Sequence, residues 1–135
     1  MKLRSRLAPA MLFLALLGGG AIHCGSEAVS GPFQPQVSNV PDNFQLDASG
    51  LSSVSMTVTY SWPNSANHAQ VTSSLASTAG SSSLVIKDGT GTPLYNKTLT
   101  PNVNDVTGAG TIGTWVIQLT LSNYSGSISV GAKKL

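Results

Sequence analysis

The strongest constraint on the fold is a strict alternation of apolar and hydroxyl side chains between positions 54 and 62. Val, Met, Val, Tyr and Trp occupy the even positions, and Ser or Thr occupies every odd position between them. A repeat of two places all the apolar side chains on one face of a β-strand, whereas a helix repeats every 3.6 residues. The segment therefore predicts a half-buried antiparallel strand, which Pro63 and Asn64 end.

The same alternation returns near the C-terminus. Apolar residues occupy the odd positions from Trp115 to Leu121, and Val116 is the one apolar residue between them. Another alternating run covers residues 127–132, and the Ser, Asn and Gly residues within 122–126 are typical of a turn. We therefore expect these two strands to form a hairpin.

Shorter runs predict four more strands, at residues 44–48, 69–75, 83–87 and 94–100. Asp88-Gly89 predicts a tight turn between the last two. No segment carries an apolar stripe with helical spacing and caps. The sequence thus predicts an all-β fold over residues 42–135, a single antiparallel β-sandwich of about seven short strands. Both an immunoglobulin-like and a jelly-roll topology fit this pattern.

The N-terminus has the layout of an export signal. Three basic residues among the first six precede an apolar run over residues 7–17, and small residues follow at 18–21. The run is shorter than the roughly 20 apolar residues that span a bilayer. The alternative, a helix of the mature domain, lacks polar residues at helical spacing. We therefore expect residues 1–23 to be a cleaved signal peptide.

Cys24 is the only cysteine, so it cannot close an internal disulfide. Together with its position just after the apolar run, the stretch Ala21-Ile22-His23-Cys24 resembles the lipobox of bacterial lipoproteins. In that family the cysteine receives a diacylglycerol thioether and becomes the new N-terminus. The resemblance implies that Cys24 is the lipid-attachment site and that the membrane is a partner through this anchor. The alternative is ordinary cleavage after Ala21, which would release a soluble secreted protein.

A tether follows the cysteine. Residues 24–41 show no apolar periodicity, and Pro32, Pro35 and Pro41 interrupt any regular element, which predicts a flexible linker. The alternative is a loosely paired first strand at 34–40. Lipoproteins with Asp after the cysteine tend to stay in the inner membrane, and here that position is Gly25. The resemblance therefore implies the outer membrane or the cell surface.

The stretch from Ser83 to Val130 resembles the small β-sandwich accessory domains of secreted bacterial proteins, such as pre-peptidase C-terminal domains. The shared features are a strand leading to Asp88-Gly89, then Gly-Thr-Trp at 113–115, then a turn at Gly126. Domains of this kind are non-catalytic appendages. The resemblance therefore implies a binding or spacing role.

The charge pattern excludes nucleic acid as a partner. Only 9% of the residues are charged, and three of the seven cations belong to the predicted signal peptide. After its removal four lysines face five acidic residues, a net charge of −1. No basic field remains to attract phosphates.

The residues offer little for catalysis. The mature part contains one histidine, His68, and a hydrolase would need it beside a serine and an acid. No Gly-x-Ser-x-Gly motif occurs, and zinc lacks ligands. Asp88 and Asp105 are the candidates for a calcium site, although the dense acidic spacing of calcium loops is missing. We expect no enzyme activity, no metal and no cofactor.

Two hypotheses remain for the function. The first is a membrane-anchored, non-enzymatic module for binding, adhesion or envelope assembly, and the second is a carbohydrate-binding module. Trp62 and Trp115 share faces with aliphatic residues, so we expect them in the core rather than on a sugar-stacking platform. Tyr95 and Tyr124 fall at predicted turns and could be exposed there. The ligand, protein or glycan, is not apparent from the sequence.

Overall fold

The computed structural model describes residues 33–135, so the predicted signal peptide, Cys24 and residues 25–32 lie outside the described residues. The described chain is all-β, as the sequence predicts. Its strands are β1 (Gln36–Val40), β2 (Asn43–Asn64), β3 (Ala69–Lys87), β4 (Pro93–Thr98), β5 (Val103–Val106) and β6 (Gly113–Lys134). They form one antiparallel sheet in the order β1-β2-β6-β3-β4, and β5 also pairs with β3. Residues 33–135 contain no helix of the length and apolar character needed to cross a membrane.

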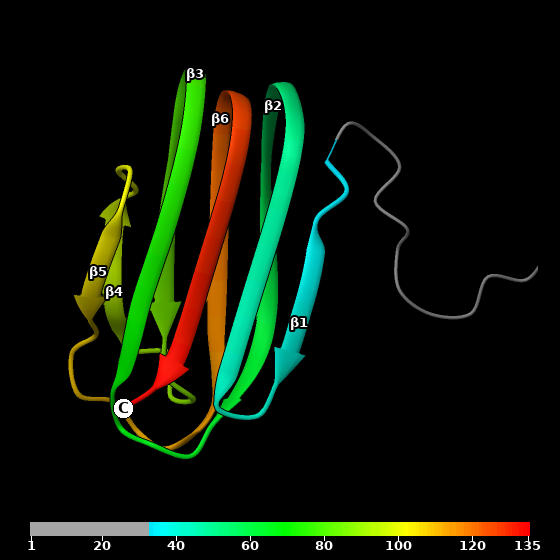
Figure 1. Ribbon diagram of the computed structural model, residues 1–135. Helices are drawn as coiled ribbons and strands as arrows, with labels where there is room; N and C mark the ends of the chain where they lie inside the picture. Colours follow the sequence, from blue (N-terminus) through cyan, green and yellow to red (C-terminus); the bar gives the residue numbers. More distant parts are fainter. Residues whose placement is uncertain (1–32) are drawn as a thin grey trace, which may run out of the picture.

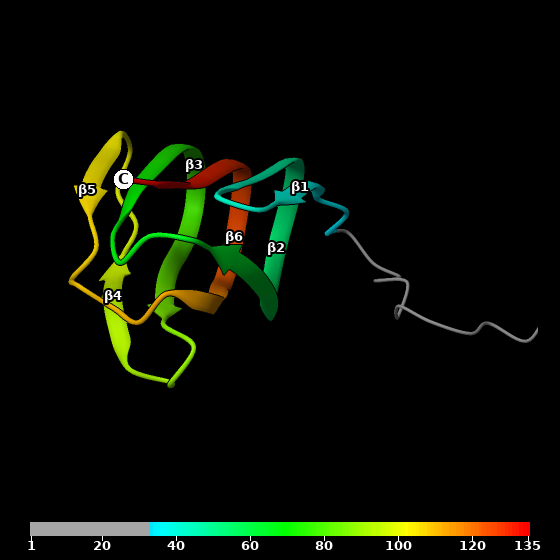
Figure 2. The same ribbon diagram turned by 90° about the horizontal axis from the view of Figure 1, so that it is seen from below.

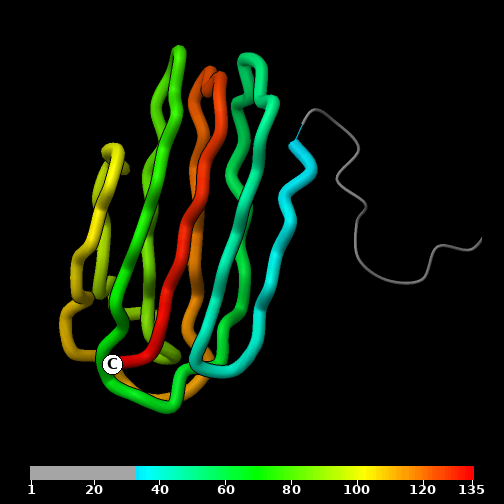
Figure 3. The backbone as a smooth tube through the Cα atoms, in the orientation of Figure 1, coloured from blue at the N-terminus to red at the C-terminus, as the bar shows by residue number. Residues whose placement is uncertain are grey.

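The three longest strands each run the length of the molecule twice. β2 and β6 have 22 residues and β3 has 19. Each rises along one side, bends over at the same end of the molecule and descends along the other side (Figures 1 and 3). The bend turns one sheet into two facing layers, which are separated in the view along the strands (Figure 2).

The strand pairing defines the two layers. The first layer contains the start of β2, the start of β3 and the end of β6, and it is extended by β1 on β2 and by β5 on β3. The second layer contains the other halves of these long strands, and β4 extends it along the end of β3. The second half of β2 consequently forms one outer edge of the second layer.

The structure has six strands where the sequence predicts about seven, and their extents differ from the predicted ones. Three pairs of predicted strands are continuous: 44–48 with 54–62 in β2, 69–75 with 83–87 in β3, and 115–121 with 127–132 in β6. The predicted hairpin at 122–126 is wrong, because the two halves of β6 do not pair with each other. The turn residues do mark changes of direction, but at these positions the strand bends from one layer to the other instead of reversing into a hairpin.

Irregular backbone produces the bend in all three strands. The pairing register of β2 with β6 shifts between Ala48 and Met56, and that of β3 with β6 shifts between Ser77 and Ser81. Such bulges kink a strand and increase its twist. Gly80 and Gly126 have φ values of 79° and 126°, a backbone region that favours glycine.

Neither expected topology describes this arrangement. Immunoglobulin-like domains and jelly rolls are built from two separate sheets. Here a single open sheet supplies both layers, because its three central strands are long enough to pass from one layer to the other. The fold is therefore sandwich-like, with hydrogen-bonded continuity between its layers.

The folded domain begins before Asp42, the residue at which the sequence predicts its start. Residues 36–40 form β1, which pairs with β2 from Gln36 opposite Asp47 to Val40 opposite Asn43. Phe33 is buried at 1% exposure. A strand thus lies at 36–40, where the alternative prediction places one at 34–40, and the folded domain includes Phe33 and β1.

The core lies between the two layers. Trp62 and Trp115 are fully buried, as expected, and their rings meet edge to face with centroids 5.8 Å apart. Both indole nitrogens donate hydrogen bonds to backbone carbonyls, Trp62 Nε1 to Val40 at 3.2 Å and Trp115 Nε1 to Thr111 at 2.8 Å. These bonds satisfy the polar atoms that burial would otherwise leave without partners.

Tyr95 and Tyr124 are both buried despite their predicted places at turns, with exposed fractions of 5% and 1%. Tyr124 belongs to the bend of β6, and its ring turns inward while its hydroxyl donates to the carbonyl of Ser127 at 2.6 Å. Tyr95 lies in β4, and its hydroxyl donates to Asp105 at 3.0 Å. Each phenol therefore buries its ring and keeps a partner for its hydroxyl.

The bend makes a testable distinction between two glycines. A Cβ at Gly126 would overlap the backbone carbonyl of Ala76, whereas a Cβ at Gly50 would meet nothing within 4 Å. Both residues have positive φ, so both alanine variants carry backbone strain. We expect Gly50→Ala to lower the free energy of unfolding by about 1 kcal/mol, and Gly126→Ala to lower it by about 3 kcal/mol.

Urea unfolding followed by tryptophan fluorescence measures both losses. Gly50→Ala is the control for alanine at a positive φ without backbone overlap. Equal losses in the two variants would contradict the close approach of β6 to β3 at the bend.

Candidate functional site

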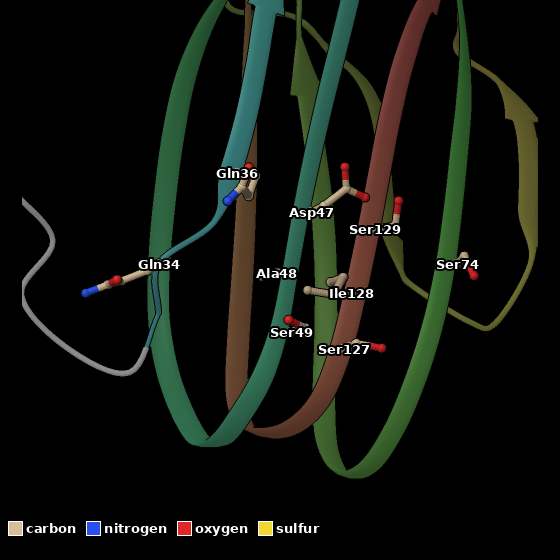
Figure 4. Close-up of a pocket in the computed structure, with 9 residues that line it drawn as sticks. All are labelled: Gln34, Gln36, Asp47, Ala48, Ser49, Ser74, Ser127, Ile128 and Ser129. Carbon is tan, nitrogen blue, oxygen red and sulfur yellow. The ribbon is translucent and has the colours of Figure 1, made fainter.

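A groove of about 380 Å³ crosses the outer face of the first layer near the bend (Figure 4). It is lined by Gln34, Gln36, Asp47, Ala48, Ser49, Ser74, Ser127, Ile128 and Ser129. These residues come from β1, β2, β3 and β6, except for Gln34, which stands two positions before β1. Its volume falls in the range of small-ligand sites, although its lining is more polar than most.

Four side chains of the groove form one row across the sheet. Gln36 pairs with Asp47, Asp47 pairs with Ser129, and Ser129 pairs with Ser74. Directly paired residues project from the same face of a sheet, so all four point outward. Serine is short, which leaves the groove open above β6 and β3.

The side-chain amide of Gln45 joins the two central residues of this row by hydrogen bonds. Gln45 Nε2 donates to Asp47 Oδ1 at 3.1 Å and to Ser129 Oγ at 2.9 Å. Asp47 is the one ionisable side chain among the nine lining residues. Its carboxylate, the glutamine amides and the serine hydroxyls together donate and accept hydrogen bonds. The groove is therefore suited to a polar ligand that carries hydroxyl or amide groups.

A second hollow of about 310 Å³ lies at the opposite end of the sandwich, with an apolar lining that includes Pro41, Pro63 and Ile112. Its acid, Asp42, is already bonded within the protein. It accepts hydrogen bonds from the backbone N–H of Ser65 at 2.7 Å and from its hydroxyl at 2.8 Å, and it pairs with Lys134 at 3.2 Å. These contacts, led by the backbone bond, lower the pKa of Asp42. Asp42 thus joins the β2–β3 turn to the end of β6.

His68 does not join a catalytic set within the described residues. Its Nδ1 lies 3.2 Å from the backbone carbonyl oxygen of Thr107, and its own carbonyl accepts from the N–H of Leu135. The hydrolase hypothesis required a serine and an acid at this ring. The structure instead places His68 just before β3, where its ring and its carbonyl both contact backbone groups.

The structure does not bring the two calcium candidates together. The Asp88 carboxylate is buried at the predicted turn and accepts backbone hydrogen bonds from Thr90, Thr92 and Thr111. The bond from Thr111 is the largest of the contributions that hold its pKa well below the usual range. Asp105 pairs instead with Lys97 at 2.9 Å. Within residues 33–135, no three His, Cys, Asp or Glu side chains gather as a metal site would require.

No protein-family model matches the chain, and no curated protein matches its sequence. The assignment of a function therefore rests on the chain's own residues.

Sequence reasoning did not find the groove. Its residues are ordinary polar positions on the outer face of alternating strands, and Asp47 stands in a short run, 44–48, that predicts only a strand. The row through Gln36, Asp47, Ser129 and Ser74 depends on the pairing register of four strands. A single sequence carries no signal for that register across distant strands.

The contacts of Tyr95 generate a prediction at alkaline pH. Burial, together with the hydrogen bond to Asp105 and its negative charge, raises the pKa of Tyr95 from 10.0 to about 12. The folded state therefore favours the neutral phenol, and this contribution to stability is complete below about pH 10 and is lost as the pH rises toward 12. We expect Tyr95→Phe to show a shallower loss of stability over this interval than the wild type.

Ultraviolet absorbance of the phenolate follows the titration directly. Asp105→Asn removes the neighbouring negative charge but leaves the burial, so we expect the pKa of Tyr95 to fall part of the way toward 10. An unchanged titration in Asp105→Asn would show that the carboxylate does not act on this phenol.

Proposed function

We propose that the protein is a lipid-anchored, non-enzymatic β-sandwich of the cell envelope that binds a polar partner through the groove of the first layer. The observation that carries the proposal is the row of Gln36, Asp47, Ser129 and Ser74, which offers hydrogen-bonding groups on an open outer face. A role in adhesion or envelope assembly fits a module of this kind, displayed at the outer membrane or cell surface.

The short segment between the predicted anchor and the domain supports a position of the groove close to the membrane. Cys24 stands nine positions before Phe33, which is already part of the core. An extended chain covers about 3.4 Å per residue, so the domain would lie within about 30 Å of the lipid. Gln34 and Gln36 then stand on the side of the domain where the tether enters. A ligand in the groove would consequently be held close to the membrane surface.

The alternative is a carbohydrate-binding module on the surface or secreted. The hydroxyl and amide lining of the groove favours a hydroxyl-rich ligand. The aromatic residues argue against it, because both tryptophans are fully buried and the nine described residues that line the groove include no aromatic side chain. A sugar would therefore bind by hydrogen bonds alone, without the stacking that an exposed aromatic platform provides.

The anchor is tested by expressing the full chain in a bacterial host beside Cys24→Ser. We expect the wild type to have the mass of a chain that starts at Cys24 and carries acyl groups, and to enter the detergent phase on partitioning. Because Cys24→Ser lacks the thiol that accepts the lipid, it should remain in the aqueous phase. A wild-type product that starts at Ile22 and stays aqueous would refute the anchor and leave a secreted protein.

The groove is tested with the aqueous Cys24→Ser protein and isolated envelopes of the same host. We expect this protein to sediment with the envelopes, and Ser74→Trp to reduce sedimentation severalfold because its bulk fills the open part of the groove. Thr98→Trp is the control, since Thr98 is exposed on β4 in the other layer. Equal sedimentation of the two tryptophan variants would contradict binding at the groove. Release of the protein by soluble envelope polysaccharide would favour the carbohydrate alternative.

A further inference from the structure

The second half of β2 is an open sheet edge. In the second layer β2 pairs with β6 on one side, from Met56 opposite Leu121 to Asn64 opposite Gly113, and its other side has no strand partner among residues 33–135. β1 pairs only with residues 43–47 of β2, in the first layer (Figure 1). A free edge presents unpaired backbone groups to any extended chain that can lie beside it.

Contacts at the end of β2 opposite the bend show which of its backbone groups face this free side. The carbonyl of Ser61 accepts from Asn39 Nδ2 at 2.8 Å, and the carbonyl of Pro63 accepts from the N–H of Asp42 at 2.9 Å. Both donors belong to the β1 side of β2, away from β6. Backbone groups alternate sides along an antiparallel strand, so Thr57 and Thr59 also direct their N–H and C=O groups outward. Pro63 agrees with this assignment, because it has no N–H and is tolerated where that group would face away from the ladder.

The apolar face of the same segment is incompletely covered. Met56, Val58 and Tyr60 point toward the core but are only partly buried, whereas Val54 and Trp62 at the two ends of the run are buried. The difference follows from the edge position, since these three side chains have a neighbouring strand on one side only. A strand added at this edge would cover them.

The other outer edges carry features that oppose strand addition, and this segment does not. β4 contains Pro93 and Lys97, β5 has only four residues, and β1 stands between Pro35 and Pro41. Proline, lysine and short length are the usual protections of an edge. Residues 51–62 contain no proline and no charged residue. A partner strand is therefore least opposed along the second half of β2.

We propose that two copies of this protein pair antiparallel along the second half of β2, around a two-fold axis at Val58. Thr57 of each copy then lies opposite Thr59 of the other, and the outward backbone groups of these residues exchange four hydrogen bonds. On the inner face Val58 meets Val58, and Met56 of each copy meets Tyr60 of the other. The dimer would join the second layers into one sheet that runs through both copies.

A second copy is the occupant because the edge is complementary to itself. The same register that pairs the outward backbone groups also places a thioether beside an aromatic ring twice, a favourable contact. With no charged residue between 51 and 62, the two edges do not repel each other. The contact consumes both open edges, so it closes as a dimer and does not propagate. The proposal goes beyond the envelope-binding role and does not depend on the lipid.

The register is tested by disulfide capture in the full chain carrying Cys24→Ser, which removes the natural thiol and the lipid site. Val58→Cys would place two thiols opposite each other at a pair that is not hydrogen-bonded across the interface, where the Cα atoms are about 4.5 Å apart. Met56→Cys is the matched control, because its two copies would be about 14 Å apart along the strands. Under a mild glutathione redox buffer, we expect Val58→Cys to form a covalent dimer and Met56→Cys to remain monomeric.

Sedimentation velocity tests the association without cysteines. We expect the Cys24→Ser protein to show a reversible monomer–dimer equilibrium, and Thr59→Lys to weaken it about tenfold by placing like charges beside the two-fold axis. Thr98→Lys adds the same charge to the outer face of the same layer at β4 and should leave the equilibrium unchanged. A protein that stays monomeric at all concentrations, or equal cross-linking of Val58→Cys and Met56→Cys, would overturn the proposal.

Discussion

Three adjacent strands bend at the same level, and the two layers of this protein exist only because they do. At the bend β6 passes so close to β3 that Gly126 lies against the carbonyl of Ala76, where a side chain has no room. The bend folds the apolar face of one sheet onto itself. The ring of Phe44 in the first layer consequently packs against the ring of Tyr60 in the second, with their centroids 5.4 Å apart. Tyr124 closes the bend from inside through its bond to Ser127. The core is thus a product of backbone irregularity as much as of apolar side chains.

The alternation that fills this core also determines the character of the surface. Every strand residue that does not face inward faces water on the outside of a layer, and in this chain those residues are mostly Ser, Thr, Gln and Asn. Two consequences are visible. The outer face of the first layer holds a polar groove, and the β2 edge of the second layer lacks the charges that would keep strands apart. Both proposed contacts therefore arise from the same uncharged composition.

The sequence predicts the local features of this fold well and its long-range features poorly. The alternation at 54–62 places every one of those residues on the correct face, and Asp88-Gly89 marks a real turn because its carboxylate caps backbone N–H groups locally. The residues at 122–126 are equally suited to reversing or to bending a strand, so the continuity of β6 was not predictable. The inward ring of Tyr124 follows from that continuity. The groove depends on the register of β1, β2, β6 and β3, which no local pattern contains.

The position of β6 in the sheet has a consequence for the order of events during synthesis. β6 is the most C-terminal strand among residues 33–135, yet it lies between β2 and β3 and pairs with both along nearly their full length. Until residues 113–134 have left the ribosome, neither of those strands has its main partner, and pairing of such distant segments is slow. The core of the domain consequently cannot close before β6 has been made. Until then the segments that form β2 and β3 lack the strand that joins them in the sheet.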